Sequence, residues 1–193
     1  LLLLSSCGGK QKAMGEAITE RDSLPVMTTL GVTTLISDSG VTRYRVNTEE
    51  WMMYDRKKPS YWAFEKGVYM EQFDSIFNVE ASIKADTAYY YDKERLWKLI
   101  GNVDIQNRKG ERFNTELLYW NEATQKVYSD KFIRIQQPDR IITGHGFDSN
   151  QQMTIYTIRN IEGIFYVDEE ASSGPPQPET KALPDSVNKD TAK

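Results

Sequence analysis

Apolar and polar residues alternate with a period of two through most of the segment 26–168, and turn residues interrupt the pattern at short intervals. The clearest run is 97–106, in which Trp97, Leu99, Val103 and Ile105 share one parity and polar residues hold most of the other. Successive side chains of a β-strand point to opposite faces, so this segment is predicted to be a strand with one buried and one solvated face. Residues 126–135 repeat the pattern less regularly and predict a second strand of this kind.

Polar segments between these runs have the composition of hairpin turns. Ser37–Gly40, Asn107–Gly110 and Asn121–Thr124 each separate two apolar runs. Residues 48–54 are predicted to be a strand, because their large apolar residues do not form one helical stripe. Val103 and Phe132 are 29 residues apart and suggest a weak hairpin repeat. Short strands without intervening amphipathic helices indicate an antiparallel sandwich, barrel or jelly roll.

The segment Gly144-His145-Gly146 has two interpretations. Glycines around a histidine can form a phosphate-binding loop or provide a metal ligand. The remaining glycines of a phosphate loop, a following helix and a second histidine are all missing from the sequence. We therefore predict a turn or strand bulge, in which glycine permits the bend.

The N-terminal residues predict a membrane anchor. Leu1–Leu4 precede Ser5, Ser6 and the single Cys7, which resembles the end of a bacterial lipoprotein signal peptide. We expect residues 1–7 to be the end of that signal with the lipid-attachment cysteine, and residues 8–25 to be a tether. Residues 26–168 would form the folded β domain, and the proline-rich residues 169–193 a disordered tail.

Composition narrows the chemistry. The chain has 24 Lys+Arg against 28 Asp+Glu, a net charge of −4, so no general basic field favours nucleic-acid binding. One cysteine and one histidine rule out a disulfide framework and a multi-cysteine zinc site, and they make a hydrolase triad difficult to assemble. We predict a protein that is not an enzyme and uses neither a metal nor a cofactor.

Four motifs together resemble a known family. They are Ser37-Asp38-Ser39-Gly40-Val41-Thr42-Arg43-Tyr44, Trp62-Ala63-Phe64-Glu65-Lys66-Gly67-Val68, Leu99-Ile100-Gly101-Asn102-Val103 and Ile142-Thr143-Gly144-His145-Gly146-Phe147. Behind a lipid-attachment cysteine, they are similar to LptC, the periplasmic component of lipopolysaccharide export, in its Bacteroidetes-type lipoprotein form. The resemblance implies an all-β fold, a twisted antiparallel β-jelly roll open along one side. Family members usually carry an N-terminal transmembrane helix, whereas the apolar segment here ends in Cys7.

The resemblance also implies a function and a location. The protein would accept the acyl chains of lipid A from an inner-membrane ABC transporter and pass them to an LptA-like periplasmic bridge protein, with which it would pair through edge strands. It would be lipid-anchored in the periplasm, with the inner membrane as the expected membrane. The expected groove residues are apolar, and each could equally be ordinary core: Trp97, Leu99, Val103, Ile105, Leu118, Trp120, Ile133, Ile135 and Ile155.

Two rival functions remain open at this point. A surface lipoprotein could bind glycans through exposed aromatic residues such as Trp51, Trp62 and Tyr89. A small glycan-active hydrolase on a β-sandwich would instead need two facing carboxylates.

Overall fold

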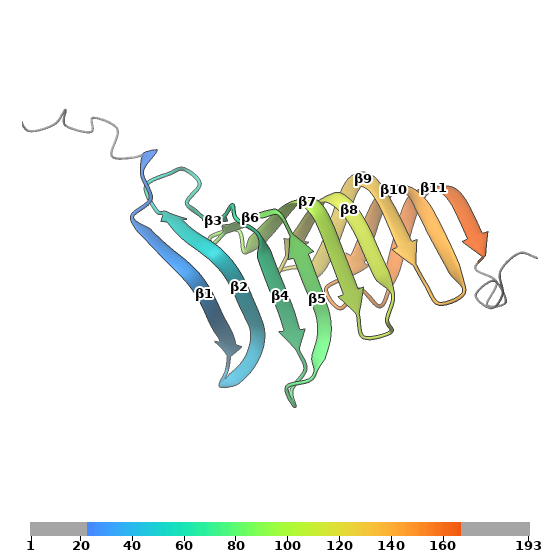
Figure 1. Ribbon diagram of the computed structural model, residues 1–193, viewed down its shortest axis with the longest axis horizontal. Coiled ribbons are helices and arrows are strands. Elements are labelled where there is room, and N and C mark those ends of the chain that lie inside the picture. The colour runs from blue at the N-terminus through green and yellow to red at the C-terminus, as the bar shows by residue number, and fades with distance from the viewer. Residues whose placement is uncertain (1–22, 167–193) are drawn as a thin grey trace, which may run out of the picture.

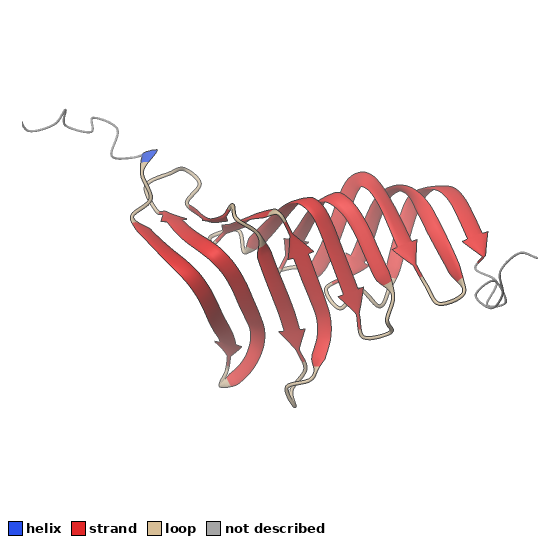
Figure 2. Ribbon diagram, in the orientation of Figure 1, coloured by secondary structure: helices blue, strands red, loops and turns tan. Residues whose placement is uncertain are grey.

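The computed structural model describes residues 23–166, which form eleven β-strands and no α-helix (Figures 1 and 2). The predicted signal end and the predicted tail lie outside these residues, as does nearly all of the tether. Among the described residues, no helix is long and apolar enough to cross a membrane. The strands are β1 (Met27–Asp38), β2 (Val41–Tyr54), β3 (Tyr61–Phe64), β4 (Val68–Phe73), β5 (Val79–Ala85), β6 (Thr87–Tyr91), β7 (Leu96–Asn107), β8 (Arg112–Asn121), β9 (Lys126–Gln136), β10 (Arg140–Asn150) and β11 (Tyr156–Tyr166).

All the strands belong to one antiparallel sheet that divides into two branches. The long strands β2 and β7 are joined by β4–β5 along one half of their length and by β3–β6 along the other half. The sheet therefore bends into two facing walls, which we name the β4–β5 wall and the β3–β6 wall. Strands β8 to β11 extend both walls in sequence order, while β1 pairs with β2 alone among these eleven described strands (Figure 1). The predicted all-β class and jelly-roll-like architecture are confirmed.

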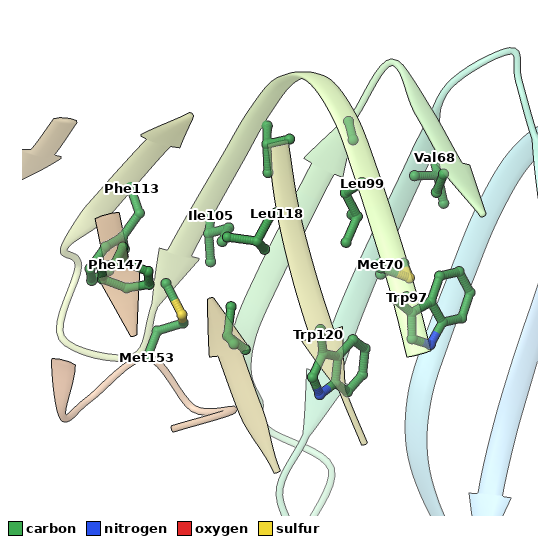
Figure 3. Packing of buried hydrophobic residues seen from close by; sticks show 14 of the residues in the cluster. Val68, Met70, Trp97, Leu99, Ile105, Phe113, Leu118, Trp120, Phe147 and Met153 are labelled. Atoms are coloured by element: carbon green, nitrogen blue, oxygen red, sulfur yellow. The ribbon is translucent and has the colours of Figure 1, made fainter. Parts of the chain in front are cut away.

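Each wall presents a row of directly opposed side chains to the interior. Such cross-strand neighbours are close enough to pack together, so the rows account for much of the core. Side chains from both rows lie in the cluster of Figure 3. The row on the β4–β5 wall is Val46, Met70, Ile83, Ile105, Phe113, Ile135, Ile142 and Ile164, and the row on the β3–β6 wall is Trp62, Tyr90, Trp97, Trp120, Val127, Ser149 and Tyr156.

The strands bend between the walls at a line of β-bulges. Pairing shifts by one residue between Ile100 and Val103 in β7 and between His145 and Phe147 in β10. Gly101 and Gly146 both have φ of 77°, a conformation that glycine adopts without steric cost. The prediction of a bulge at Gly144–Gly146 is confirmed.

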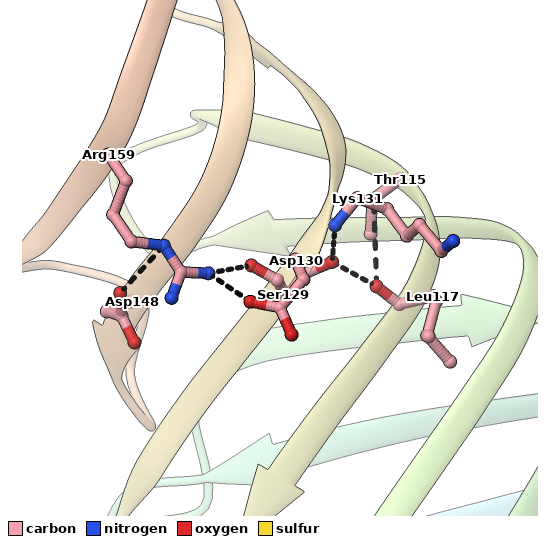
Figure 4. A network of polar contacts seen from close by, with 7 residues as sticks. All are labelled: Thr115, Leu117, Ser129, Asp130, Lys131, Asp148 and Arg159. Atoms are coloured by element: carbon pink, nitrogen blue, oxygen red, sulfur yellow. Dashed lines mark hydrogen bonds and ion pairs between the residues drawn. The ribbon is translucent and has the colours of Figure 1, made fainter.

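Buried hydroxyl groups satisfy backbone carbonyls at this bend (Figure 4). Thr115 Oγ1 donates to Phe132 O over 2.7 Å, and Ser129 Oγ donates to Leu117 O over 2.6 Å. Arg159 Nη2 on the edge strand β11 donates to Ser129 O over 2.6 Å and also forms an ion pair with Asp130. These bonds replace ladder hydrogen bonds that the bulges interrupt, so the bend carries little cost in unpaired polar groups.

The β10–β11 loop closes one margin of the roll. Met153 in this loop is 1% exposed and packs in the core. Its carbonyl oxygen accepts a hydrogen bond over 2.8 Å from Nδ2 of Asn107, the last residue of β7. Asn107 Nδ2 also donates to the buried Glu111 over 2.7 Å. The loop thus ties the end of β10 to the opposite wall.

The predicted turns and the predicted strand agree with the structure, whereas the predicted repeat does not. The three predicted hairpin turns and the strand at 48–54 are confirmed. The proposed repeat is out of register by one residue, because Val103 is fully buried whereas Phe132 is 43% exposed on the outer surface. Thr115 lies opposite both Val103 and Ile133, so Ile133 is the residue of β9 that corresponds to Val103.

Candidate functional site

A groove opens between the walls at the N-terminal end of the roll. It has a volume of about 630 Å³. Strand β1 forms one side with Val32, Thr34 and Ile36, and the strands β3, β6 and β7 supply much of the opposite side. Among the described strands only β2 pairs with β1, so the groove lies beside an edge strand of the described sheet.

Aromatic side chains form the floor of this groove. The rings of Trp51 and Trp62 lie 5.0 Å apart, and the ring of Trp51 lies 5.9 Å from that of Phe64. The contacts continue from Trp62 to Tyr90 at 5.1 Å and from Tyr90 to Trp97 at 4.7 Å. Packed rings present a large apolar surface that is fixed in shape, which suits contact with flexible hydrocarbon chains.

Glu122 organises the polar rim. Its carboxylate accepts hydrogen bonds from Trp97 Nε1 over 2.9 Å and from the Tyr90 hydroxyl over 3.3 Å. Arg95 Nε lies 3.6 Å from the same carboxylate. Burial, followed by the negative charge of Glu122, raises the pKa of Tyr90 to about 12. The neutral Tyr90 hydroxyl keeps its proton for the hydrogen bond to Glu122, which holds the ring against the floor.

Two indole groups have no hydrogen-bond acceptor. Within residues 23–166, Nε1 of Trp51 and Nε1 of Trp120 are the buried side-chain polar atoms without a partner. A buried N–H without an acceptor costs free energy. Trp51 lines the groove with its ring, while its Nε1 atom is buried away from solvent.

The predicted groove residues fall into three groups. Trp97 lines the groove and packs in the core. Ile155 is 76% exposed in the β10–β11 loop, and the structure does not bring it to the other eight. Seven residues pack against one another and are at most 4% exposed: Leu99, Val103, Ile105, Leu118, Trp120, Ile133 and Ile135.

Sequence reasoning missed most of the groove lining. Val32, Thr34 and Ile36 do alternate, but the signal is obscured, because Leu35 is an exposed apolar residue of the opposite parity and Leu30, of the same parity, is also exposed. The sequence predicts Trp51 and Trp62 only as exposed residues of a glycan-binding surface, whereas they lie against each other inside the groove. A run of closely spaced aromatic residues was the available signal.

The part of the chain that the structure describes holds no group of three or more histidine, cysteine or acidic residues arranged for a metal ion.

Comparison with known proteins identifies the family. A search of curated proteins gave no match. Residues 19–164 match the family described as "Lipopolysaccharide-assembly, LptC-related". The match spans well over half of the chain, so the chain belongs to the LptC-related family of lipopolysaccharide-assembly proteins.

Proposed function

We propose that the protein binds acyl chains of lipopolysaccharide in the groove at the N-terminal end of the roll and passes them along the periplasm. The observation that carries the proposal is the aromatic groove of about 630 Å³, open to solvent at an end of a continuous apolar interior. Each methylene removed from water contributes about 0.8 kcal/mol, so burial of about ten methylenes would contribute about 8 kcal/mol, the free energy of micromolar binding. The sugars remain outside.

The direction of transfer comes from the partners. An inner-membrane ABC transporter supplies the lipid and the energy, and an LptA-like bridge protein receives it, so this chain needs no catalytic step. The edge of β11 supports transfer by strand addition, because within residues 23–166 β11 pairs only with β10. On the inner face of β11, Ile161 and Ile164 are 58% and 47% exposed and could be covered by a like-folded partner.

The buried members of the predicted lining keep a place in this proposal. Leu99, Val103 and Leu118 fill the space between the walls, so a chain could contact them only if the walls moved apart. The groove is therefore the entrance, and the packed interior beyond it is the path toward β11. Ile155 faces solvent and would contact cargo only from outside.

A lipid anchor on Cys7 would hold the domain at the membrane, with the inner membrane as our proposed location. Replacing the thiol should abolish thioether attachment. In cells fed a fatty-acid analogue, the wild-type protein should carry the label and Cys7→Ser should not. Equal labelling of both would contradict the anchor.

The glycan-binding alternative finds less support. Trp51 and Trp62 line the groove, whereas the Tyr89 hydroxyl donates to the exposed Glu65 and the Tyr89 ring packs near Tyr61. Tyr89 does not line the groove, so the three aromatic residues form no shared platform for a sugar ring.

Adjacent residues on β1 offer a matched test of lipid binding. Ile36 lines the groove, while Leu35 is exposed outside it and differs from Ile36 only in the branching of the side chain. A charge at Ile36 must be desolvated when an acyl chain binds, so Ile36→Asp should weaken lipopolysaccharide binding at least tenfold. Leu35→Asp should leave binding within about twofold of wild type, the usual range for a neutral surface change. Equal binding by both variants and the wild type would contradict the proposal.

A further inference from the structure

The inner end of the groove is separated from a second, much smaller cavity. The smaller cavity has a volume of about 10 Å³. Tyr44, Gln72 and Gln151 line both spaces. The division between the two spaces is therefore made of these three side chains.

Tyr44 contributes the part of the division that reaches across the interior. It lies on β2 directly opposite Gln72 on β4, in the β4–β5 wall. Its ring packs edge-on against Trp120 of β8, with centroids 5.2 Å apart and planes at 63°. Trp120 belongs to the row of the facing wall. The side chain of Tyr44 thus extends from one wall to the other.

The β10–β11 loop supplies the third side. Gln151 N donates to Gln125 O over 3.1 Å, which fixes the start of the loop against the turn between β8 and β9. Gln151 and Gln72 carry flexible polar side chains, whereas Tyr44 carries the rigid ring. Burial, and then the negative charge of Glu122, raises the pKa of Tyr44 further above neutral pH, where a tyrosine hydroxyl is already uncharged.

The space beyond Tyr44 is suited to hydrocarbon. Met70, Ala81 and Ile83 line the smaller cavity together with Trp120. Met70 and Ile83 are adjacent members of the apolar row that continues toward β11. Removal of the Tyr44 ring would join the groove to this space, in which the polar lining residues are Gln72, Gln151 and Glu71.

We propose that Tyr44 is the stop that limits how much of an acyl chain the groove accepts. The inference rests on the proposed function, since it concerns the length of the chain that enters the same groove. A chain that reaches Tyr44 gains nothing from further methylenes, because they remain in water. Longer insertion requires the ring to turn away from Trp120.

A chain-length series measures this limit. The full chain would be titrated with lysophosphatidylglycerols carrying saturated chains from about 8 to about 18 carbons, each below its critical micelle concentration. Affinity should rise about fourfold with each methylene until the chain meets Tyr44, and then level off. Tyr44→Ala should move this break to chains longer by about two methylenes or more. Tyr44→Phe keeps the ring and should keep the wild-type break.

Two further variants keep the test decisive. Tyr119 stacks on Tyr128 at 5.3 Å and lines neither cavity, so Tyr119→Ala removes an equal side chain from the same sheet and should not move the break. If Tyr44→Ala does not fold, Tyr44→Leu fills part of the space and should give a smaller shift in the same direction. A break at the same length in wild type and in the folded Tyr44→Ala or Tyr44→Leu protein would overturn the role of Tyr44 alone. Wild-type affinity that does not depend on chain length would overturn the proposed function itself.

Discussion

An aspartate introduced into a closed core should destabilise the fold far more than an aspartate introduced into an open groove. Val103 on β7 is 0% exposed, and its predicted role as groove lining requires space that the structure fills with other side chains. Val32 on β1 is half-buried and lines the groove. The substitutions Val103→Asp and Val32→Asp therefore make the same chemical change in the two environments.

The expected magnitudes differ severalfold. At Val103 the change forfeits about 1.5–3 kcal/mol of apolar burial. An uncompensated buried charge adds about 3–5 kcal/mol. Together these approach the total stability of about 5–15 kcal/mol that is typical of a domain. At Val32 the introduced carboxylate stays hydrated in the empty groove, so the loss should be below about 1 kcal/mol.

Urea unfolding followed by tryptophan fluorescence measures the loss of stability in each of the two variants. Burial raises the pKa of the carboxyl group introduced at Val103, so this variant binds a proton more readily when folded than when unfolded. Its deficit relative to wild type is then greatest at neutral pH and shrinks as the pH falls toward about 3.9, the ordinary pKa of aspartate. A Val103→Asp protein within about 1 kcal/mol of wild type at pH 7 would refute the closed core at this position.

Three further predictions test the bend, the loop and a surface ion pair. Thr115→Val removes the hydroxyl that bonds to Phe132 O and should cost about 1–3 kcal/mol in chemical unfolding, whereas no loss would mean that the hydroxyl is dispensable at the bulge. Met153→Ala empties a site that is 1% exposed and should cost about 2–4 kcal/mol, seen as a lower melting temperature, and an unchanged midpoint would show that the loop is not packed. The Arg112 hydrogen bond lowers the pKa of Asp104, so the pair stabilises the fold above the ordinary aspartate pKa, and this contribution is lost as the pH falls through the folded-state value. Because the Arg112 side chain is 57% exposed, Asp104→Asn should cost only about 0.5 kcal/mol at pH 7 and nothing in strong acid, and an equal loss at both pH values would contradict the charge argument.

Alternation along the chain predicted the buried face of β7 correctly. Trp97, Leu99, Val103 and Ile105 are all at most 2% exposed. The pattern works here because β7 has paired neighbours on both edges, so its inward face has no access to solvent. The class of fold followed from many strands of this kind.

At the bend, a strand switches from odd-numbered to even-numbered inward residues, and a simple alternation does not predict this switch. On β8, Leu118 and Trp120 face inward with even numbers, whereas Phe113 and Thr115 face inward with odd numbers. The change occurs where the pairing of β8 shifts against both β7 and β9. A bulge depends on the neighbouring strands, so the sequence of one strand does not reveal its position.

The groove was harder to predict than the core for a related reason. Whether an inward apolar side chain meets another side chain or open space depends on the separation of the walls, which no local period encodes. Loop residues show no regular alternation of apolar and polar side chains. The sequence analysis predicts Ile155 of this loop as an inward residue, whereas the hydrogen bonds of Asn107 and Asn150 turn Met153 inward and leave Ile155 exposed.

Photo-crosslinking in cells tests the central claim most directly. A photoreactive phenylalanine analogue would replace Trp62 in the groove, Leu99 in the closed core and Phe132 on the outer surface, one position at a time. We expect lipopolysaccharide to be captured strongly from Trp62 and at background level from Phe132, with capture from Leu99 only if the walls part during transfer. Capture from Phe132 equal to that from Trp62, or none from Trp62 in a folded and correctly located protein, would contradict the account.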